Sequence, residues 1–129
     1  MANSAVLFLA GRLALVAIFL LAGLNKISAY EGTAGWMESM GVPGVMLPLV
    51  IALELGAGLA IAFGLFTRLA ALAIAGFSVA SALIFHLDFN DQIQFLMFWK
   101  NIAIAGGFLV LAAAGAGNLS LDARRQQEV

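Results

Sequence analysis

Four long apolar stretches dominate the pattern of hydrophobic and polar positions. A helix needs about 20 apolar residues to cross the hydrocarbon core of a bilayer, and the stretches at residues 5–25, 43–65, 69–85 and 93–117 approach or exceed that length. The third is short but contains no charged residue, which suits a thin core or an upright helix. Unpaired backbone groups are costly in lipid, so an open sheet is excluded. The pattern predicts an all-α integral membrane protein.

The connections between these stretches predict their arrangement. Those at residues 66–68 and 86–92 are short, which favours antiparallel neighbours. The longer connection, 26–42, is expected to hold a short helix capped by Thr33, with Tyr30 and Trp36 anchoring it at the membrane surface. We therefore predict a four-transmembrane-helix antiparallel bundle with a short interfacial helix between the first and second spans.

Composition agrees with this class and excludes several functions. Hydrophobic residues make up 64% of the chain and charged residues 10%, whereas soluble domains have about 45–50% and about 25%. The spans nearly exhaust the 129 residues, so we expect a single membrane domain, 1–129, with a short tail at 118–129 and no cleaved signal peptide. The sequence has no basic cluster of the kind that would indicate nucleic-acid binding. Without cysteine and with one histidine, the chain is expected to hold no intrinsic cofactor.

The distribution of basic residues predicts the orientation. Arg68, Arg124 and Arg125 fall on the side of the termini, whereas the opposite connections carry Lys26 beside four acidic residues. By the positive-inside rule, both termini and the tail are predicted to be cytoplasmic in a multi-pass protein.

Three charged residues lie within the spans. At about 1.5 Å per residue, Glu54 is about 17 Å from the outer end of the second span, and Arg12 and Lys100 are each about 10 Å inside theirs. An unpaired charge at such depth costs at least about 3 kcal/mol and normally faces the bundle interior. We expect Glu54 to pair with Arg12, Lys100 or both.

Helical spacing groups other residues with these charges. Arg12, Phe19 and Lys26 recur every seven residues and so share one face of the first span. In the fourth span, Asn101 lies beside Trp99 and Lys100. We predict a small polar cavity that opens outward, with the ligand-binding candidates Arg12, Lys26, Glu54, Trp99, Lys100 and Asn101.

Two interpretations of these charges remain open. Buried pairs can serve only to fix helix register, whereas intramembrane ionisable groups commonly bind a ligand or relay protons. In the second span, small residues at 52, 56, 60 and 64 form a ladder that favours internal packing over a dimer interface. The turn containing His86, Asp88 and Asp91 has metal-friendly side chains, but we expect a solvated turn and no metal site.

The whole chain, from about residue 10 to 122, resembles the DoxX family of small bacterial inner-membrane proteins, in its short single-module form. The matching segments are GRLALVAIFLLAGLNKI, GTAGWMESMGVPG, LELGAGLAIAFGLFTRLAAL, FWKNIAIAGGFLVL and GAGNLSLD. The resemblance implies a four-helix membrane bundle. It also implies a link to redox chemistry, since the family takes its name from subunits of a thiosulfate:quinone oxidoreductase and other members are associated with oxidative or quinone stress. The charged residues Arg12, Lys26, Glu54 and Lys100 match the family pattern.

These observations lead to one functional hypothesis and two alternatives. The hypothesis is a redox-linked accessory protein that binds a quinone or similar lipophile, with Lys100, Arg12 and Asn101 donating hydrogen bonds, Trp99 stacking and Glu54 holding the cations. Catalysis is expected only as a subunit of an oxidoreductase complex, with partner proteins. The alternatives are a proton-coupled transporter, which would need a homo-oligomer, and a non-catalytic scaffold for a partner enzyme.

Overall fold

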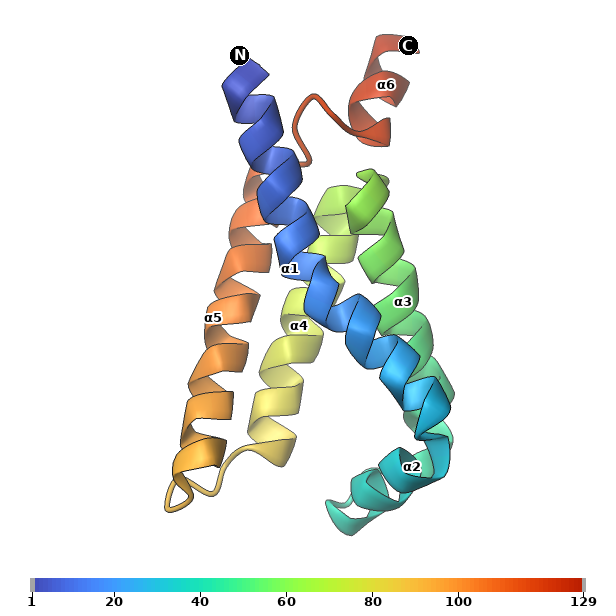
Figure 1. Ribbon diagram of the computed structural model, residues 1–129, viewed down its shortest axis with the longest axis vertical. Coiled ribbons are helices and arrows are strands. Elements are labelled where there is room, and N and C mark those ends of the chain that lie inside the picture. Colours follow the sequence, from blue (N-terminus) through green and yellow to red (C-terminus); the bar gives the residue numbers. More distant parts are fainter. Residues whose placement is uncertain (1, 129) are drawn as a thin grey trace.

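Four long helices form the body of the molecule in the computed structural model, which describes residues 2–128. They are α1 (Ala2–Ser28), α3 (Leu47–Phe63), α4 (Thr67–Phe85) and α5 (Gln92–Ala114), and successive long helices run in opposite directions (Figure 1). Each of them forms all or most of a segment long and apolar enough to cross a membrane. The described residues contain no strand. The predicted all-α four-helix membrane bundle is confirmed.

Three short elements complete the chain. Helix α2 (Tyr30–Ser39) follows α1 after one residue, and the 3₁₀ turn η1 (Gly44–Met46) leads into α3. Helix α6 (Leu121–Glu128) forms most of the predicted tail, whose last residue, 129, lies outside the described residues. The N- and C-terminal ends of the bundle lie at the same end of the molecule (Figure 1). We call this the terminal end, and the other the distal end.

The prediction that Thr33 caps the short helix is wrong. Helix α2 begins at Tyr30, and its N-cap residue, Ala29, makes no side-chain cap hydrogen bond. Thr33 lies inside the helix, where its backbone N–H and its hydroxyl group both donate to Ala29 O at 2.9 Å.

Two glycines fix where the spans end. Gly64 and Gly115, directly after α3 and α5, have φ values of 72° and 85°. Glycine reaches this left-handed region without the steric cost that a Cβ imposes, and it commonly ends helices there. The fourth span therefore ends at Ala114, three residues before the predicted boundary at 117.

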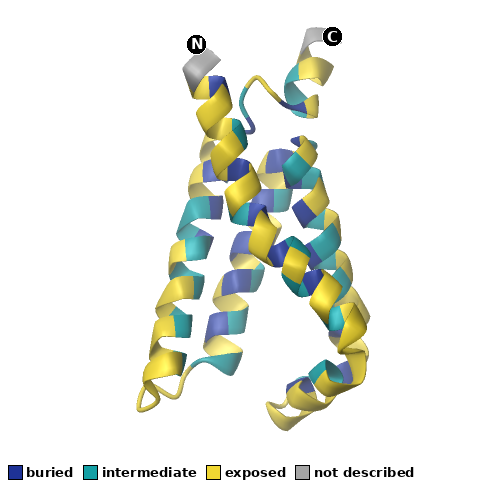
Figure 2. Ribbon diagram, in the orientation of Figure 1, coloured by how far each residue is buried: buried dark blue, intermediate teal, exposed yellow. Residues whose placement is uncertain are grey.

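The long helices pack as two pairs, α1 with α3 and α4 with α5. The pairs meet around a core at mid-height that includes Phe19, Ile61, Ile74 and Phe108, and the rings of Phe19 and Phe108 lie edge to face at 5.5 Å. Toward the distal end the two pairs diverge (Figure 1). The outer faces are largely exposed (Figure 2), and many large apolar side chains are among the exposed residues, where they contact the lipid of the bilayer.

Close helix contacts depend on glycines outside the predicted ladder. A Cβ at Gly23, Gly58 or Gly107 would lie 2.7–2.9 Å from a leucine side chain on a neighbouring helix. In the ladder itself, Ala52 and Gly56 are exposed. The prediction of internal packing is therefore wrong for these two residues, because the other face of α3 turns toward α1.

Candidate functional site

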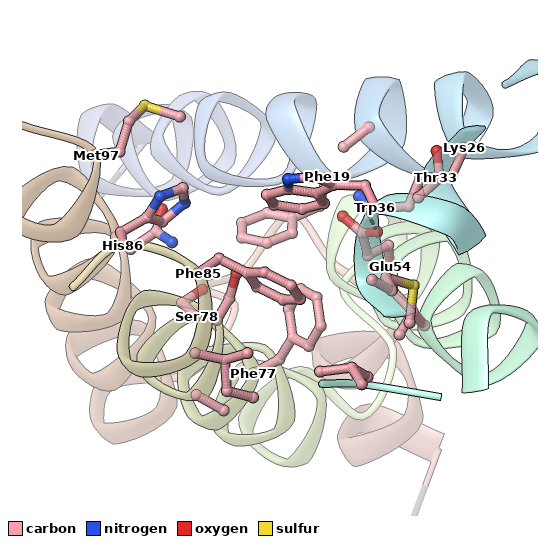
Figure 3. Close-up of a pocket in the computed structure, with 18 of the residues that line it drawn as sticks. Phe19, Lys26, Thr33, Trp36, Glu54, Phe77, Ser78, Phe85, His86 and Met97 are labelled. Carbon is pink, nitrogen blue, oxygen red and sulfur yellow. Dashed lines mark ion pairs between the residues drawn. The ribbon is translucent and has the colours of Figure 1, made fainter. Parts of the chain in front are cut away.

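A cavity of about 480 Å³ lies between the two helix pairs in the distal half of the molecule. Most of its lining is aromatic or aliphatic, with a few polar groups among them (Figure 3). The apolar lining includes Ile18, Phe19, Trp36, Met37, Val50, Phe77, Ile84, Phe85, Met97 and Ile104. Helix α2 contributes Thr33, Trp36 and Met37, so the interfacial helix forms one wall of the cavity.

The central polar feature is an ion pair between α1 and α3. Lys26 Nζ lies 2.7 Å from Glu54 Oε1, and the two side chains are 25% and 2% exposed. Because α1 and α3 are antiparallel, a residue near the end of α1 and one in the first half of α3 reach the same depth. The predicted interior position of Glu54 is correct, but the predicted partners, Arg12 and Lys100, are wrong.

Arg12 lies toward the terminal end and is buried there, 2% exposed. Its guanidinium donates hydrogen bonds to three carbonyl oxygens: Ala116 at 2.6 Å, Leu119 at 2.9 Å and Ala62 at 3.3 Å. These carbonyls follow α5 or belong to the last turn of α3. Arg12 therefore binds the C-terminal segment to the bundle and is not part of the cavity.

Helix α5 presents only one of its three predicted site residues to the cavity. Asn101 lines it, whereas Trp99 is 52% exposed and Lys100 is exposed. Successive helical residues are rotated by about 100°, so a helix that directs residue 101 inward turns residues 99 and 100 away. Trp99 and Lys100 therefore lie outside the lining of this cavity, contrary to the predicted cavity composition.

Trp36 supplies the aromatic ring that sequence reasoning assigned to Trp99. Its indole stacks on Phe85, with ring centroids 4.5 Å apart and an angle of 22° between the planes. Both residues line the cavity. The stack joins α2 to the last residue of α4, across the divergence of the two pairs.

Two polar residues of the α4 wall, Ser78 and His86, were not predicted to line the cavity. Ser78 is 2% exposed, and neither its Oγ nor His86 Nδ1 has a hydrogen-bond partner among the described residues. The sequence contained a signal for this wall, because a spacing of four residues puts positions 78, 82 and 86 on one side of an extended helical pattern. His86, expected in a solvated turn, is half-buried and lines the cavity, because it directly follows α4. Burial and the positive charge of Lys100 lower the pKa of His86 below its ordinary 6.5, so it is neutral at pH 7.

A separate polar cluster at the terminal end holds α6 in place. The Asp122 carboxylate accepts hydrogen bonds from the backbone N–H groups of Phe66 (2.8 Å) and Thr67 (2.9 Å) at the start of α4. Partial burial opposes ionisation of Asp122, but these hydrogen bonds and the charge of Arg125 outweigh it, so the pKa of Asp122 lies below its ordinary 3.8. The cluster lies at the opposite end of the bundle from the cavity, and none of these four residues lines it.

Comparison with known proteins places the chain in a family. The family model described as DoxX matches residues 7–87. The chain belongs to the DoxX family. This DoxX protein is 52% identical to inner membrane protein YqjF of Escherichia coli over 88% of each chain, and 39% identical to inner membrane protein YphA of the same organism over 92% of this chain and 90% of YphA.

A more distant relative carries a name that refers to redox chemistry. It is the Bacillus subtilis protein named "Putative oxidoreductase CatD", 32% identical over 81% of this chain and 76% of the relative. No solved structure matches the DoxX chain significantly. The region matched by the family model contains Lys26, Glu54, Ser78 and His86, and therefore most of the polar lining of the cavity.

Proposed function

We propose that this DoxX protein binds a small lipophilic molecule with a polar group, a quinone or hydroquinone, in the cavity between its helix pairs, and that it serves an inner-membrane redox system as an accessory subunit. One observation carries the proposal: the Lys26–Glu54 ion pair lines an otherwise largely apolar cavity of about 480 Å³. Ligand pockets commonly have about 300–1,000 Å³, apolar walls and few polar groups.

The alternative is that the ion pair only fixes α1 against α3. Burying two charges costs desolvation energy that mutual attraction often fails to recover, so such pairs are poor devices for stability alone. A purely structural pair also needs no cavity beside it. The position of Lys26 and Glu54 on a cavity wall therefore favours the binding role.

The cavity offers suitable chemistry for an oxygenated ring. Lys26 Nζ donates hydrogen bonds and suits a carbonyl oxygen, whereas the Glu54 carboxylate accepts them and suits a hydroxyl group. Phe19, Trp36 and Phe77 line the same cavity and provide aromatic surfaces for the ring. The apolar walls suit a molecule that dissolves in the bilayer.

The redox part of the proposal requires a partner. The chain has no cysteine and one histidine, so it lacks the ligands for an iron–sulfur cluster or bis-histidine haem of its own. The name of the Bacillus subtilis relative supports a redox setting. Electrons would pass between the bound molecule and a partner oxidoreductase.

The two tryptophans provide a direct binding test, because Trp36 lines the cavity and Trp99 lies outside it. Menadione, a quinone, quenches tryptophan fluorescence. We expect saturable quenching in Trp99→Phe, which retains Trp36, and only weak, non-saturating quenching in Trp36→Phe. Loss of a charge-assisted hydrogen bond costs about 1.5–3 kcal/mol, so Glu54→Gln or Lys26→Met in the Trp99→Phe background should weaken binding about tenfold or more.

Arg124→Met is the matched control, since it removes an exposed cation at the terminal end, outside the cavity lining. It should bind menadione as the Trp99→Phe parent does. Non-saturating quenching in every variant, together with lower melting temperatures for Glu54→Gln and Lys26→Met, would show that the pair is structural.

A further inference from the structure

The cavity has hydrogen-bonding groups on both of its opposing walls. The first wall, formed by α1 and α3, carries Lys26 and Glu54, and the second, formed by α4 and α5, carries Ser78, His86 and Asn101. We propose that Ser78 and His86 form a second binding subsite, so that the ligand is held at both ends: an apolar ring body with an oxygen or nitrogen on each of two opposite sides. This inference rests on the proposed function and specifies the class of ligand.

The two walls face each other at the same depth. Glu54 lies seven residues after the start of α3 and Ser78 seven residues before the end of α4. Because both counts start from the distal end, each residue lies about 10 Å from that end along its helix. Figure 3 shows Lys26 and Glu54 on one side of the cavity, and Ser78 and His86 toward the other.

Ser78 is the strongest evidence for the second subsite. A buried serine in a helix usually donates to a carbonyl of the preceding turn, yet the Oγ of Ser78 has no partner among the residues the structure describes. Leaving a buried hydroxyl unpaired is unfavourable. A hydroxyl that lines a cavity and lacks an internal partner is available to a ligand.

His86 extends this subsite toward the distal end. It lies eight residues beyond Ser78, directly after the last residue of α4, and its Nδ1 is likewise unpartnered within the described chain. Asn101 lines the cavity from α5, and its amide both donates and accepts. A ligand with a polar group at one end only would leave the polar groups of one wall unsatisfied.

The test compares two probes and one variant of each wall. Menadione has carbonyl oxygens on opposite sides of its ring, whereas tetralone has a bicyclic body with one carbonyl oxygen. Binding to the full chain is measured by titration calorimetry in detergent micelles. The variants are Lys26→Met for the first wall and Ser78→Ala for the second, with Ser28→Ala, an exposed serine outside the cavity, as the matched control.

A ligand held at both ends loses affinity when either wall changes. We expect menadione to bind about fivefold more weakly to Ser78→Ala, the effect of losing one neutral hydrogen bond, and more weakly still to Lys26→Met. Tetralone should lose affinity in Lys26→Met alone, because its single oxygen goes to the charged donor. His86→Leu gives an independent readout of the second wall and does not depend on the folding of Ser78→Ala.

The failure of this inference differs from that of the proposed function. If menadione binds Ser78→Ala, His86→Leu and Ser28→Ala equally well but loses affinity in Lys26→Met, the cavity binds one end only and the second subsite is overturned. If neither probe binds the wild-type protein, the proposed function and the second subsite fail together.

Discussion

At the scale of single residues, a group needed for binding is expected to cost stability when no ligand is present. The unpaired Oγ of Ser78 carries such a cost, of about 1–3 kcal/mol for a buried group without a partner. We predict that Ser78→Ala raises the melting temperature of the ligand-free protein by a few degrees, relative to Ser28→Ala. The measurement is a thermal melt in detergent. A lower melting temperature for Ser78→Ala would mean that its hydroxyl contributes to packing.

Two of the three charges predicted to face the interior, Glu54 and Arg12, do so, whereas Lys100 is exposed. The partners of the interior charges could not be predicted. The cost of a charge in lipid places Glu54 and Arg12 in the interior without knowledge of any coordinates. Partner choice depends on the depth and rotation of each helix, which length and spacing do not fix. A rotation of about 100° per residue was enough to direct Asn101, and not Lys100, into the cavity.

At the scale of elements, the C-terminal segment is bound to the bundle through polar contacts. Arg12 donates to the carbonyls of Ala116 and Leu119, and Asp122 accepts from the start of α4. The first contact binds the segment between α5 and α6, and the second binds the start of α6. An arginine and an aspartate 110 positions apart in sequence thus fix one segment, which no local pattern reveals.

The Asp122 contact should depend on pH in a defined direction. Because the pKa of Asp122 is lowered in the folded protein, its stabilising contribution is present above the ordinary value of 3.8 and is lost as the pH falls below that value and through the lowered one. We predict that the amide resonances of Phe66 and Thr67 are unchanged from pH 7 to 5 and shift only below pH 4.

Asp122→Asn should remove this titration, whereas Asp88→Asn, in the exposed turn before α5, should leave it intact. If the Phe66 and Thr67 resonances of the wild-type protein shift with a midpoint above pH 4, the pKa of Asp122 is not lowered and the prediction is contradicted.

At the scale of the whole molecule, the number and order of the spans could be predicted, because each apolar stretch is long and each connecting turn is short. The ends of the spans were predicted less accurately. Helix α5 ends earlier than predicted, because Gly115, which follows it, has a positive φ. The divergence of the two helix pairs was not predictable, since it results from packing between distant segments. The cavity depends on that divergence, and so the wall that carries Ser78 and His86 was missed.

The orientation in the membrane is a prediction at this scale, and the absence of cysteine makes it directly testable. Asn118 is exposed at the terminal end and Asn90 at the distal end. With cytoplasmic termini, Asn90→Cys should react with a membrane-impermeant maleimide in bacterial cells whose outer membrane alone is permeabilised. Asn118→Cys should react only after the inner membrane is also permeabilised. The reverse labelling pattern would show that the termini lie on the opposite side of the membrane from the one predicted.

The stack of Trp36 on Phe85 has a consequence for the speed of ligand exchange. Such ring pairs contribute about 0.5–1.5 kcal/mol beyond the burial of their surface. If a ligand enters between α2 and the end of α4, the rings must separate during both entry and exit. The stack would then slow association and dissociation by the same factor, roughly twofold to tenfold, and leave the equilibrium affinity unchanged. Residence time in the cavity would be set partly by two side chains that need not form any hydrogen bond with the ligand.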